Sequence, residues 1–159
     1  MSSKMPKNNA VEIGLERKYV LYVVTVLLCA VACFVALIYT QTDTRTVRLG
    51  TNTFKLELAT TPAQHAVGLS GRDTIDPNGG MLFVFDTPAQ YCFWMKDTHI
   101  SLDILWLDRE GQVIDLIENV DPASYPESFC PDKDASYVVE LPAGSVTSSG
   151  VVVGTRTDF

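Results

Sequence analysis

An uninterrupted apolar run near the N-terminus divides the chain into two parts. Residues Tyr19–Tyr39 include no charged side chain. At about 1.5 Å of helical rise per residue, a run of this length crosses the roughly 30 Å hydrocarbon core of a bilayer. A buried helix of a soluble protein would normally show a polar stripe, which this run lacks on every face. The pattern therefore predicts a transmembrane signal-anchor helix at residues 19–39.

The flanking charges predict the orientation of this helix. Four positive residues precede the run and two follow it: Lys4, Lys7, Arg17 and Lys18, then Arg45 and Arg48. Positive charge is retained on the cytoplasmic side, so we expect a cytoplasmic tail at residues 1–18 and an extracytoplasmic domain, in the periplasm or at the cell surface. Two alternatives stay open: a signal peptide cleaved after the small residues Ala30–Ala32, or a lipid-modified Cys33.

Beyond a polar linker at residues 40–52, the pattern changes to that of short strands. Thr53–Ala59 alternates apolar and polar residues, as a half-buried strand does. Thr61 followed by proline predicts a short helix at Pro62–Leu69, ended by Gly71. The turn residues Asp76–Gly80 then lead into a continuous apolar run, Met81–Phe85, which predicts a buried strand.

The second half of the domain repeats this strand pattern. We expect strands at Tyr91–Lys96, Leu102–Asp108, Gln112–Val120 and Tyr137–Leu141, a surface loop at Asp121–Asp134, a helical turn from Ser145 to Gly150, and an edge strand at Val151–Val153. Many short strands separated by turn residues predict a mainly β domain at residues 53–159, an antiparallel sandwich or barrel with one or two short helices.

Charge and cysteine usage restrict the function and the compartment. From Thr42 onward, 8 Lys and Arg face 17 Asp and Glu, a net charge of −9, so a nucleic-acid partner is not expected. Cys92 and Cys130 are the two cysteines of this part of the chain, and oxidising compartments favour pairing, so they are a candidate disulfide. Phosphate-loop and dinucleotide motifs are absent, and no cofactor is expected.

Several short motifs resemble one family. They are Gly68-Leu69 with Arg72, Gly80-Met81-Leu82-Phe83, Phe93-Trp94-Met95-Lys96 with Thr98, Leu102-Asp103, and Glu140-Leu141-Pro142-Ala143-Gly144. In this combination the chain resembles the domain of unknown function 192 family from about Phe54 to Val153. The resemblance implies a jelly-roll-like β protein, frequently secreted or membrane-anchored, with no assigned reaction. The chain departs from the family pattern at Ser70, Asp97 and Ser101, where methionine, asparagine and proline are usual.

The polar residues of these motifs are the candidate ligand site. Alternation places Asp103 on the same face as Leu105 and Leu107, and Arg72 is its expected partner in a structural ion pair. The alternative is a ligand site built from Arg72, Trp94, Thr98, Asp103 and Glu140, in which the indole stacks on a ligand and the carboxylates accept hydrogen bonds. The ordinary interpretation of the apolar residues of these motifs is a place in the core, and it covers Phe93, Trp94, Met95, Met81 and Phe83.

A metal site is a weaker hypothesis. If Asp97–Asp103 is extended, Asp97, His99 and Asp103 share one face and could hold a divalent metal, whereas a solvated face is the ordinary interpretation. His65 is expected to be a surface histidine.

Three functions follow from these observations. The leading hypothesis is a membrane-tethered binding or accessory module of the cell envelope. The first alternative is a hydrolase of envelope glycans that uses Asp103 and Glu140 as a carboxylate pair. The second is a structural partner of another envelope protein. The sequence does not decide whether the protein is an enzyme, or whether its ligand is a small molecule, a glycan or a protein.

Overall fold

The computed structural model describes residues 9–39 and 42–158, with side chains described for 18–34 and 42–158. The chain forms two compact units, residues 1–41 and 42–159. Helix α1 (Asn9–Tyr39) belongs to the first unit and includes the expected span, although the side chains of residues 35–39 lie outside the described part. The tail residues Lys4 and Lys7 also lie outside it. Across the described residues, no helix combines the length and apolarity that crossing a membrane requires.

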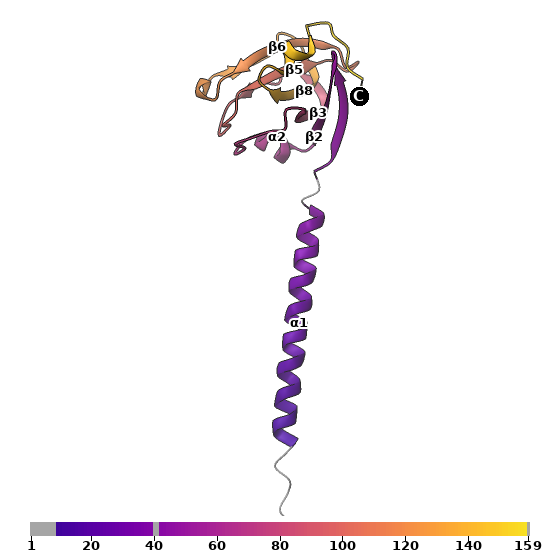
Figure 1. Cartoon of the computed structure of the whole chain (residues 1–159), viewed down its shortest axis with the longest axis vertical. Coiled ribbons are helices and arrows are strands. Elements are labelled where there is room, and N and C mark those ends of the chain that lie inside the picture. The colour runs from indigo at the N-terminus through magenta and orange to yellow at the C-terminus, as the bar shows by residue number, and fades with distance from the viewer. Residues whose placement is uncertain (1–8, 40–41, 159) are drawn as a thin grey trace, which may run out of the picture. The chain divides into compact units, whose positions relative to one another are not determined.

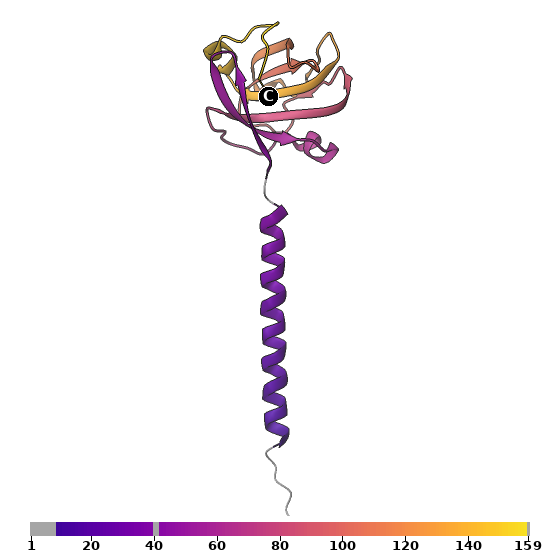
Figure 2. The same cartoon turned by 90° about the vertical axis from the view of Figure 1, so that its right-hand side faces the viewer.

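A six-stranded mixed sheet dominates the second unit (Figure 1). Its spatial order is β1-β2-β3-β8-β5-β6, with the bounds β1 Thr44–Leu49, β2 Asn52–Ala59, β3 Gly79–Ala89, β5 Leu102–Leu107, β6 Val113–Val120 and β8 Ala135–Pro142. The long arrows of β3 and β8 run side by side in Figure 2, where Met81 pairs with Glu140. The mainly β class predicted from the sequence is confirmed.

Two details of the predicted architecture are different. The sheet is not fully antiparallel, because β2 and β3 pair in parallel through contacts such as Leu56 with Gly80. A parallel pair needs a long crossover, and the segment between these strands supplies it, with the short helix α2 (Pro62–Val67). Residues Thr44–Leu49, expected in the linker, form β1, because Val47 and Leu49 enter the core while their neighbours stay exposed.

Each face of the sheet packs against its own hydrophobic core. One face carries Leu56, Leu105 and Val139 and is covered by helix α3 (Ser145–Ser149) through Val146. The opposite face carries Phe83, Ile104 and Val138 among others, and Leu69 and Met95 from the connecting segments pack onto it. Since side chains alternate along a strand, the register decides which polar groups can meet on a given face.

The C-terminal residues lie against both edges of the sheet. Arg48 of β1 forms an isolated bridge with Asp158, and Gln112 beside β6 forms one with Arg156. The expected edge strand at Val151–Val153 is wrong, because the chain turns here and Thr155 donates its N–H to the carbonyl of Val152. The helical turn expected between Ser145 and Gly150 is confirmed as α3.

A small second sheet lies in the part of the chain expected to form a strand and a long loop. Strands β4 (Phe93–Trp94) and β7 (Ser128–Phe129) pair antiparallel. Between β6 and β7 the loop contains a 3₁₀ turn, η1 (Pro122–Ser124), capped by the side chain of Asp121. The predicted surface loop Asp121–Asp134 therefore contains a short helical turn, η1, and a short strand, β7.

Candidate functional site

A pocket of about 630 Å³ lies on the face of the sheet that carries Phe83 and Val138. Short motifs that are distant in the sequence meet around it. Three of the five candidate ligand residues line it: Trp94, Thr98 and Glu140. Six of its sixteen lining residues carry aromatic rings: His65, Phe83, Phe85, Tyr91, Phe93 and Trp94. Ligand pockets of small molecules typically measure about 300–1,000 Å³ and combine such side chains with a few polar groups.

Helix α2 forms one side of the pocket. Thr61 and Gln64 form a reciprocal capping box, and Pro62 fits the first turn, so the helix starts as the sequence predicts. It ends earlier than expected, at Gly68 rather than at Gly71. Gly68 has a φ of +50°, and a Cβ there would lie 3.3 Å from the ring of Phe83 and 3.7 Å from Oε2 of Glu140. Glycine therefore keeps the space above the Glu140 carboxyl group open.

The segment after α2 docks onto the turn that follows β4. Gly71 donates its N–H to the carbonyl of Asp97 at 2.7 Å, and Ser70 donates its hydroxyl to the carbonyl of Lys96 at 3.0 Å. Asp97 has a φ of +54°, a conformation that aspartate and asparagine tolerate better than most residues. This explains why the substitution of aspartate for the usual asparagine of the family is compatible with the turn.

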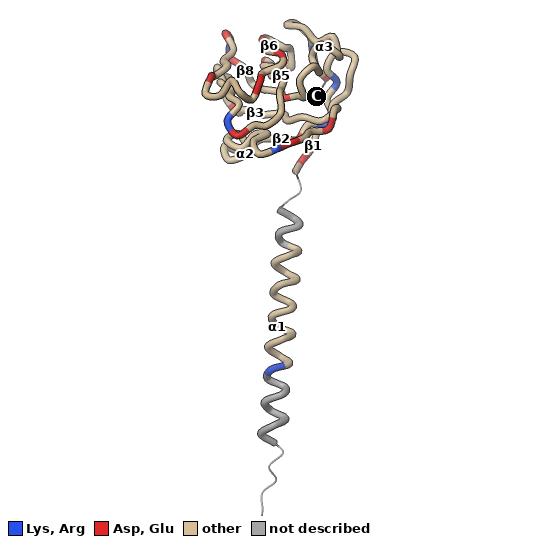
Figure 3. The backbone as a smooth tube through the Cα atoms, turned by 60° about the vertical axis from the view of Figure 1, so that its left-hand side comes forward, with Lys and Arg blue, Asp and Glu red and all other residues tan. Residues whose placement is uncertain are grey.

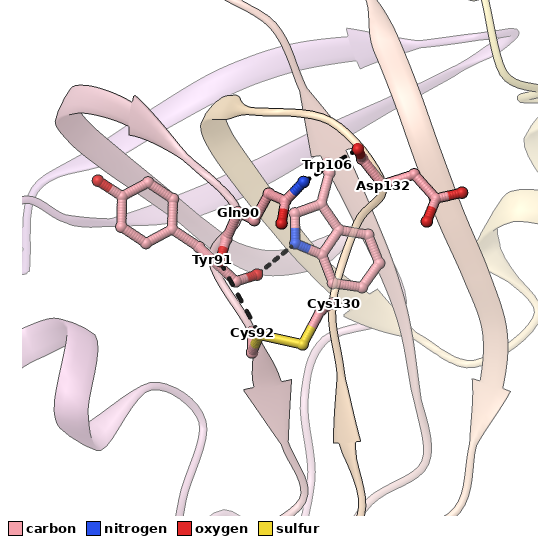
Figure 4. Close-up of a disulfide and its surroundings, with 6 residues drawn as sticks. All are labelled: Gln90, Tyr91, Cys92, Trp106, Cys130 and Asp132. Atoms are coloured by element: carbon pink, nitrogen blue, oxygen red, sulfur yellow. Dashed lines mark hydrogen bonds between the residues drawn. A yellow bond between two sulfur atoms is a disulfide. The ribbon is translucent and has the colours of Figure 1, made fainter.

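A disulfide beside the pocket links the residue before β4 to the residue after β7 (Figure 4). It links Cys92, which lines the pocket, to Cys130. On one side of it, Trp106 donates its indole N–H to the carbonyl of Tyr91 at 2.8 Å. Gln90 donates to the carbonyl of Asp132 at 3.0 Å. These links hold the aromatic wall of Tyr91, Phe93 and Trp94 against the main sheet.

Glu140 is a buried carboxyl residue of the pocket with an unpartnered oxygen atom. Its neighbours across the sheet are Met81 on β3 and Ile104 on β5, which offer no hydrogen bond to a carboxyl group. Glu140 is 6% exposed, and its Oε2 is buried without a hydrogen-bond partner. Burial raises the pKa of Glu140 from 4.5 to about 8, and the positive charge of Arg72 opposes this only in part. The carboxyl group is therefore largely protonated at neutral pH.

Comparisons with known proteins place the chain in a family. The model of the DUF192 family, described as "Uncharacterized ACR", matches residues 44–159. The chain belongs to the DUF192 family. Searching the curated proteins returned no match.

Two solved structures are similar to this DUF192 chain. One, described as a "putative transcription regulator" from Sinorhizobium meliloti 1021, is 33% identical with a TM-score of 0.71, over 75% of this chain and 95% of that one. The other is a protein of unknown function from Novosphingobium aromaticivorans DSM 12444, which is 24% identical with a TM-score of 0.70. This match covers 76% of this chain and 88% of that one. At this identity the second match shows a similar fold and nothing more.

Arg72 pairs with a different carboxylate from the one expected. Its guanidinium donates to both carboxylate oxygens of Glu57 on β2, at 2.7 Å to Oε2. This hydrogen-bonded pair lowers the pKa of Glu57 and raises that of Arg72. The expected Arg72–Asp103 pair is wrong, because Asp103 lies on the other face of the sheet.

Asp103 has a structural environment and does not line the pocket. It is fully buried, with the backbone N–H groups of Asn119 and Val146 donating to its two oxygens at 2.8 Å each. In the register, Asp103 pairs with Leu141, and Glu140 pairs with Ile104, so the two carboxyl groups point to opposite faces. A carboxylate pair of Asp103 and Glu140, on which the glycan-hydrolase alternative depended, is therefore excluded.

The hypothesis of a metal site at Asp97, His99 and Asp103 is also wrong. Asp97 lies in a turn with Lys96, and the chain from Thr98 to Ser101 is irregular, so these residues and Asp103 of β5 do not form one extended strand. Nδ1 of His99 lies 2.8 Å from a carboxylate oxygen of Asp73. Within the described part of the chain, no group of three or more His, Cys, Asp or Glu side chains is placed to hold a metal ion.

Several residues of the DUF192 pocket were not predicted from the sequence. His65 was expected on the surface, but its ring lies 4.5 Å from that of Phe85, and its Nε2 lies 2.9 Å from the carbonyl oxygen of Ala59. Tyr91 stacks on Phe85 with ring centroids 3.5 Å apart. One signal was present: Phe83 and Phe85 alternate with Val84 and so share a face. Trp94, expected in the core, is 54% exposed and lies at the mouth of the pocket.

Proposed function

We propose that this protein is a membrane-tethered, extracytoplasmic binding module whose ligand occupies the pocket above Glu140. The observation that carries the proposal is the buried Oε2 of Glu140, which has no hydrogen-bond partner and belongs to the lining of an aromatic pocket. Buried polar groups in folded proteins are almost always hydrogen-bonded, so an exception that faces a cavity points to a partner that binds there. Binding requires no second carboxyl group, unlike the hydrolase alternative.

The compartment is supported by two features of the chain. The 21 residues Tyr19–Tyr39 carry no charge and lie on α1, and the β unit contains the Cys92–Cys130 disulfide, a bond rare in cytosolic proteins. The Sinorhizobium relative is described as a "putative transcription regulator", but the net charge of −9 from Thr42 onward opposes binding of this chain to nucleic acid.

Binding is tested by a thermal-shift screen of the full-length protein, purified in detergent, against collections of amines, sugars, carboxylates and amides. A ligand at 100 times its dissociation constant stabilises the folded state by about 2.7 kcal/mol, which is readily measured as a higher melting temperature. We expect at least one compound class to raise this temperature.

Two substitutions on α2 identify the site of any compound that binds. Ala66 lines the pocket, whereas Ala63 is exposed on the same helix outside it. Ala66→Trp should fill part of the pocket and abolish the shift, and Ala63→Trp should leave it intact. A shift that survives Ala66→Trp would place the ligand elsewhere and contradict the proposal, as would the absence of any shift.

The membrane topology has a separate test in cells whose cytoplasmic membrane is intact. With Cys29 and Cys33 replaced by alanine, a membrane-impermeant maleimide should label Glu110→Cys, in the exposed turn between β5 and β6, but not Ser2→Cys. Labelling of Ser2→Cys alone would invert the proposed orientation. Recovery of the full-length chain in the soluble cytosolic fraction would refute the tether.

A further inference from the structure

We infer that the ligand of this pocket is a small organic cation, whose ammonium group lies against the carboxylate of Glu140 and contacts the surrounding aromatic rings. This inference rests on the proposed binding function and names the chemical class of the ligand. It follows from the partners that Glu140 lacks, from the composition of the walls, and from the charge of the β unit.

Among the described residues, no Lys, Arg or His forms an ion pair with the carboxyl group of Glu140. Arg72 is near enough to influence the ionisation of Glu140, but its Nη1 and Nη2 donate to Glu57 rather than to Glu140. The side chain of Lys96 is exposed at the pocket and does not hydrogen-bond to Glu140 in the described structure. An ammonium group that enters the pocket would provide both a positive charge and N–H donors to the unpartnered Oε2.

Aromatic walls favour the same class of ligand. The face of an aromatic ring carries partial negative charge, so a cation within about 6 Å of the ring centre is attracted to it, more strongly when water is excluded. Phe83 and Phe93 meet edge to face with centroids 4.8 Å apart, and the stacked rings of Phe85 and Tyr91 continue the wall. Trp94 at the mouth adds an indole, the side chain that binds cations best.

The charge of the whole β unit acts in the same direction. Asp and Glu outnumber Lys and Arg from Thr42 onward, and red positions are more frequent than blue ones along this part of Figure 3. A negative field raises the local concentration of cations and lowers that of anions. Lys96 opposes this at the rim, but the adjacent Asp97 also lines the pocket, and both side chains are exposed to screening by salt.

Cation binding must be linked to proton release. Burial raises the pKa of Glu140 to about 8, so the carboxyl group is mostly protonated below this pH, whereas an ammonium group requires the carboxylate. Each bound cation therefore displaces close to one proton at about pH 7 and below, and fewer as the pH approaches 8. Other charged or titratable groups around Glu140 are His65 from α2, Arg72 from the following segment, Tyr91 from the segment before β4, and Lys96 and Asp97 from the turn after β4. At the paired positions, β3 and β5 present only Met81 and Ile104.

The test is calorimetric titration of the full-length protein in detergent with four probes. Butylammonium carries charge and N–H donors, tetramethylammonium carries charge alone, 1-butanol is neutral, and butyrate is an anion. We expect butylammonium to bind at least tenfold more tightly than 1-butanol at pH 8, and tetramethylammonium to lie between them. The affinity for butylammonium should rise nearly tenfold from pH 6 to pH 7 and level off above pH 8, with about one proton released per ligand at pH 7.

Two variants assign this pH dependence. Glu140→Gln keeps the shape of the side chain but removes its charge, so butylammonium should lose both its preference over 1-butanol and its pH dependence. Glu127→Gln, on an exposed residue outside the pocket, should retain both. Equal binding of butylammonium and 1-butanol would overturn the inference, as would binding of none of the probes.

The outcomes separate this inference from the proposed function. Tight binding of butyrate that weakens above pH 8 would show that protonated Glu140 donates a hydrogen bond to an anion. The cation class would then be wrong, while the pocket would remain a binding site. If the compound screen also gives no ligand that Ala66→Trp blocks, the proposed function itself fails.

Discussion

Replacing Glu140 by glutamine should change how the stability of the β unit depends on pH. In the folded protein, burial raises the pKa of this carboxyl group from its ordinary value of 4.5 to about 8. In the unfolded chain the group is solvated and titrates near the ordinary value. Between these two values the folded state holds one proton that the unfolded state has lost.

The sign and magnitude follow from proton linkage. Because the folded state binds the extra proton, the stabilising effect is complete below pH 4.5 and disappears as the pH rises through about 8. The slope in this window is about −1.4 kcal/mol per pH unit. The accumulated loss at pH 7 is on the order of 3 kcal/mol, a large share of the stability of a typical domain. Glutamine does not titrate, so the variant should lack this slope.

Urea denaturation at pH 5, 6, 7 and 8 measures the difference. Trp94 and Trp106 are the two tryptophans of the chain, and both lie in the β unit, so their fluorescence follows its unfolding. The wild type should lose stability relative to Glu140→Gln at every step, whatever constant offset the amide introduces. Glu127→Gln, on an exposed residue, should follow the wild type. Parallel profiles for wild type and Glu140→Gln would show that Glu140 is ionised in the folded protein and would refute the reasoning.

Three further predictions concern other residues of the β unit. Replacing Cys92 and Cys130 by serine should lower the free energy of unfolding by about 4 kcal/mol, since the disulfide bridges a sequence separation of 38 residues. An unchanged midpoint of urea denaturation would contradict this. Asp103→Asn should cost about 2 kcal/mol, because the amide turns one acceptor into a donor facing a backbone N–H, while ligand affinity stays unchanged. Glu57→Gln should cost about 1 kcal/mol after allowance for solvent screening of its pair with Arg72. The lowered pKa of Glu57 means that this cost, measured by denaturation at several pH values, should vanish in acid rather than in base.

Local sequence signals predicted most of the strands and both short helices of the β unit. The apolar run Met81–Phe85 lies within β3, and Thr61 caps α2 through its side chain, as its position before a proline indicates. The hairpin at Asp108–Gly111 joins β5 to β6, where the side chain of Asp108 accepts two backbone N–H groups of the turn. These features depend on residues close together in sequence, which is why the pattern was sufficient.

Pairing between distant elements could not be predicted in the same way. Alternation correctly placed Asp103 with Leu105 and Leu107, which share one core with it. It could not show that Arg72 lies above the opposite face, because Arg72 follows a helix and has no strand period of its own. The parallel β2–β3 pair is a second example, since nothing local distinguishes it from an antiparallel one. The family motifs identified the pocket residues Trp94, Thr98 and Glu140, but their resemblance carried no geometry.

The two buried carboxyl groups, on adjacent positions of neighbouring strands, show why hydrogen-bond satisfaction separates structure from function here. The carboxylate of Asp103 accepts hydrogen bonds from the backbone N–H groups of Asn119 in β6 and Val146 in α3. These bonds join β5 to β6 and to α3, and they compensate the cost of burying the carboxylate. Glu140 receives none at Oε2, and it belongs to the lining of a cavity that Gly68 leaves open. A carboxyl group that served stability alone would be better replaced by an apolar residue, as Met81 and Ile104 beside it indicate. Its presence is explained if the missing partner is a ligand.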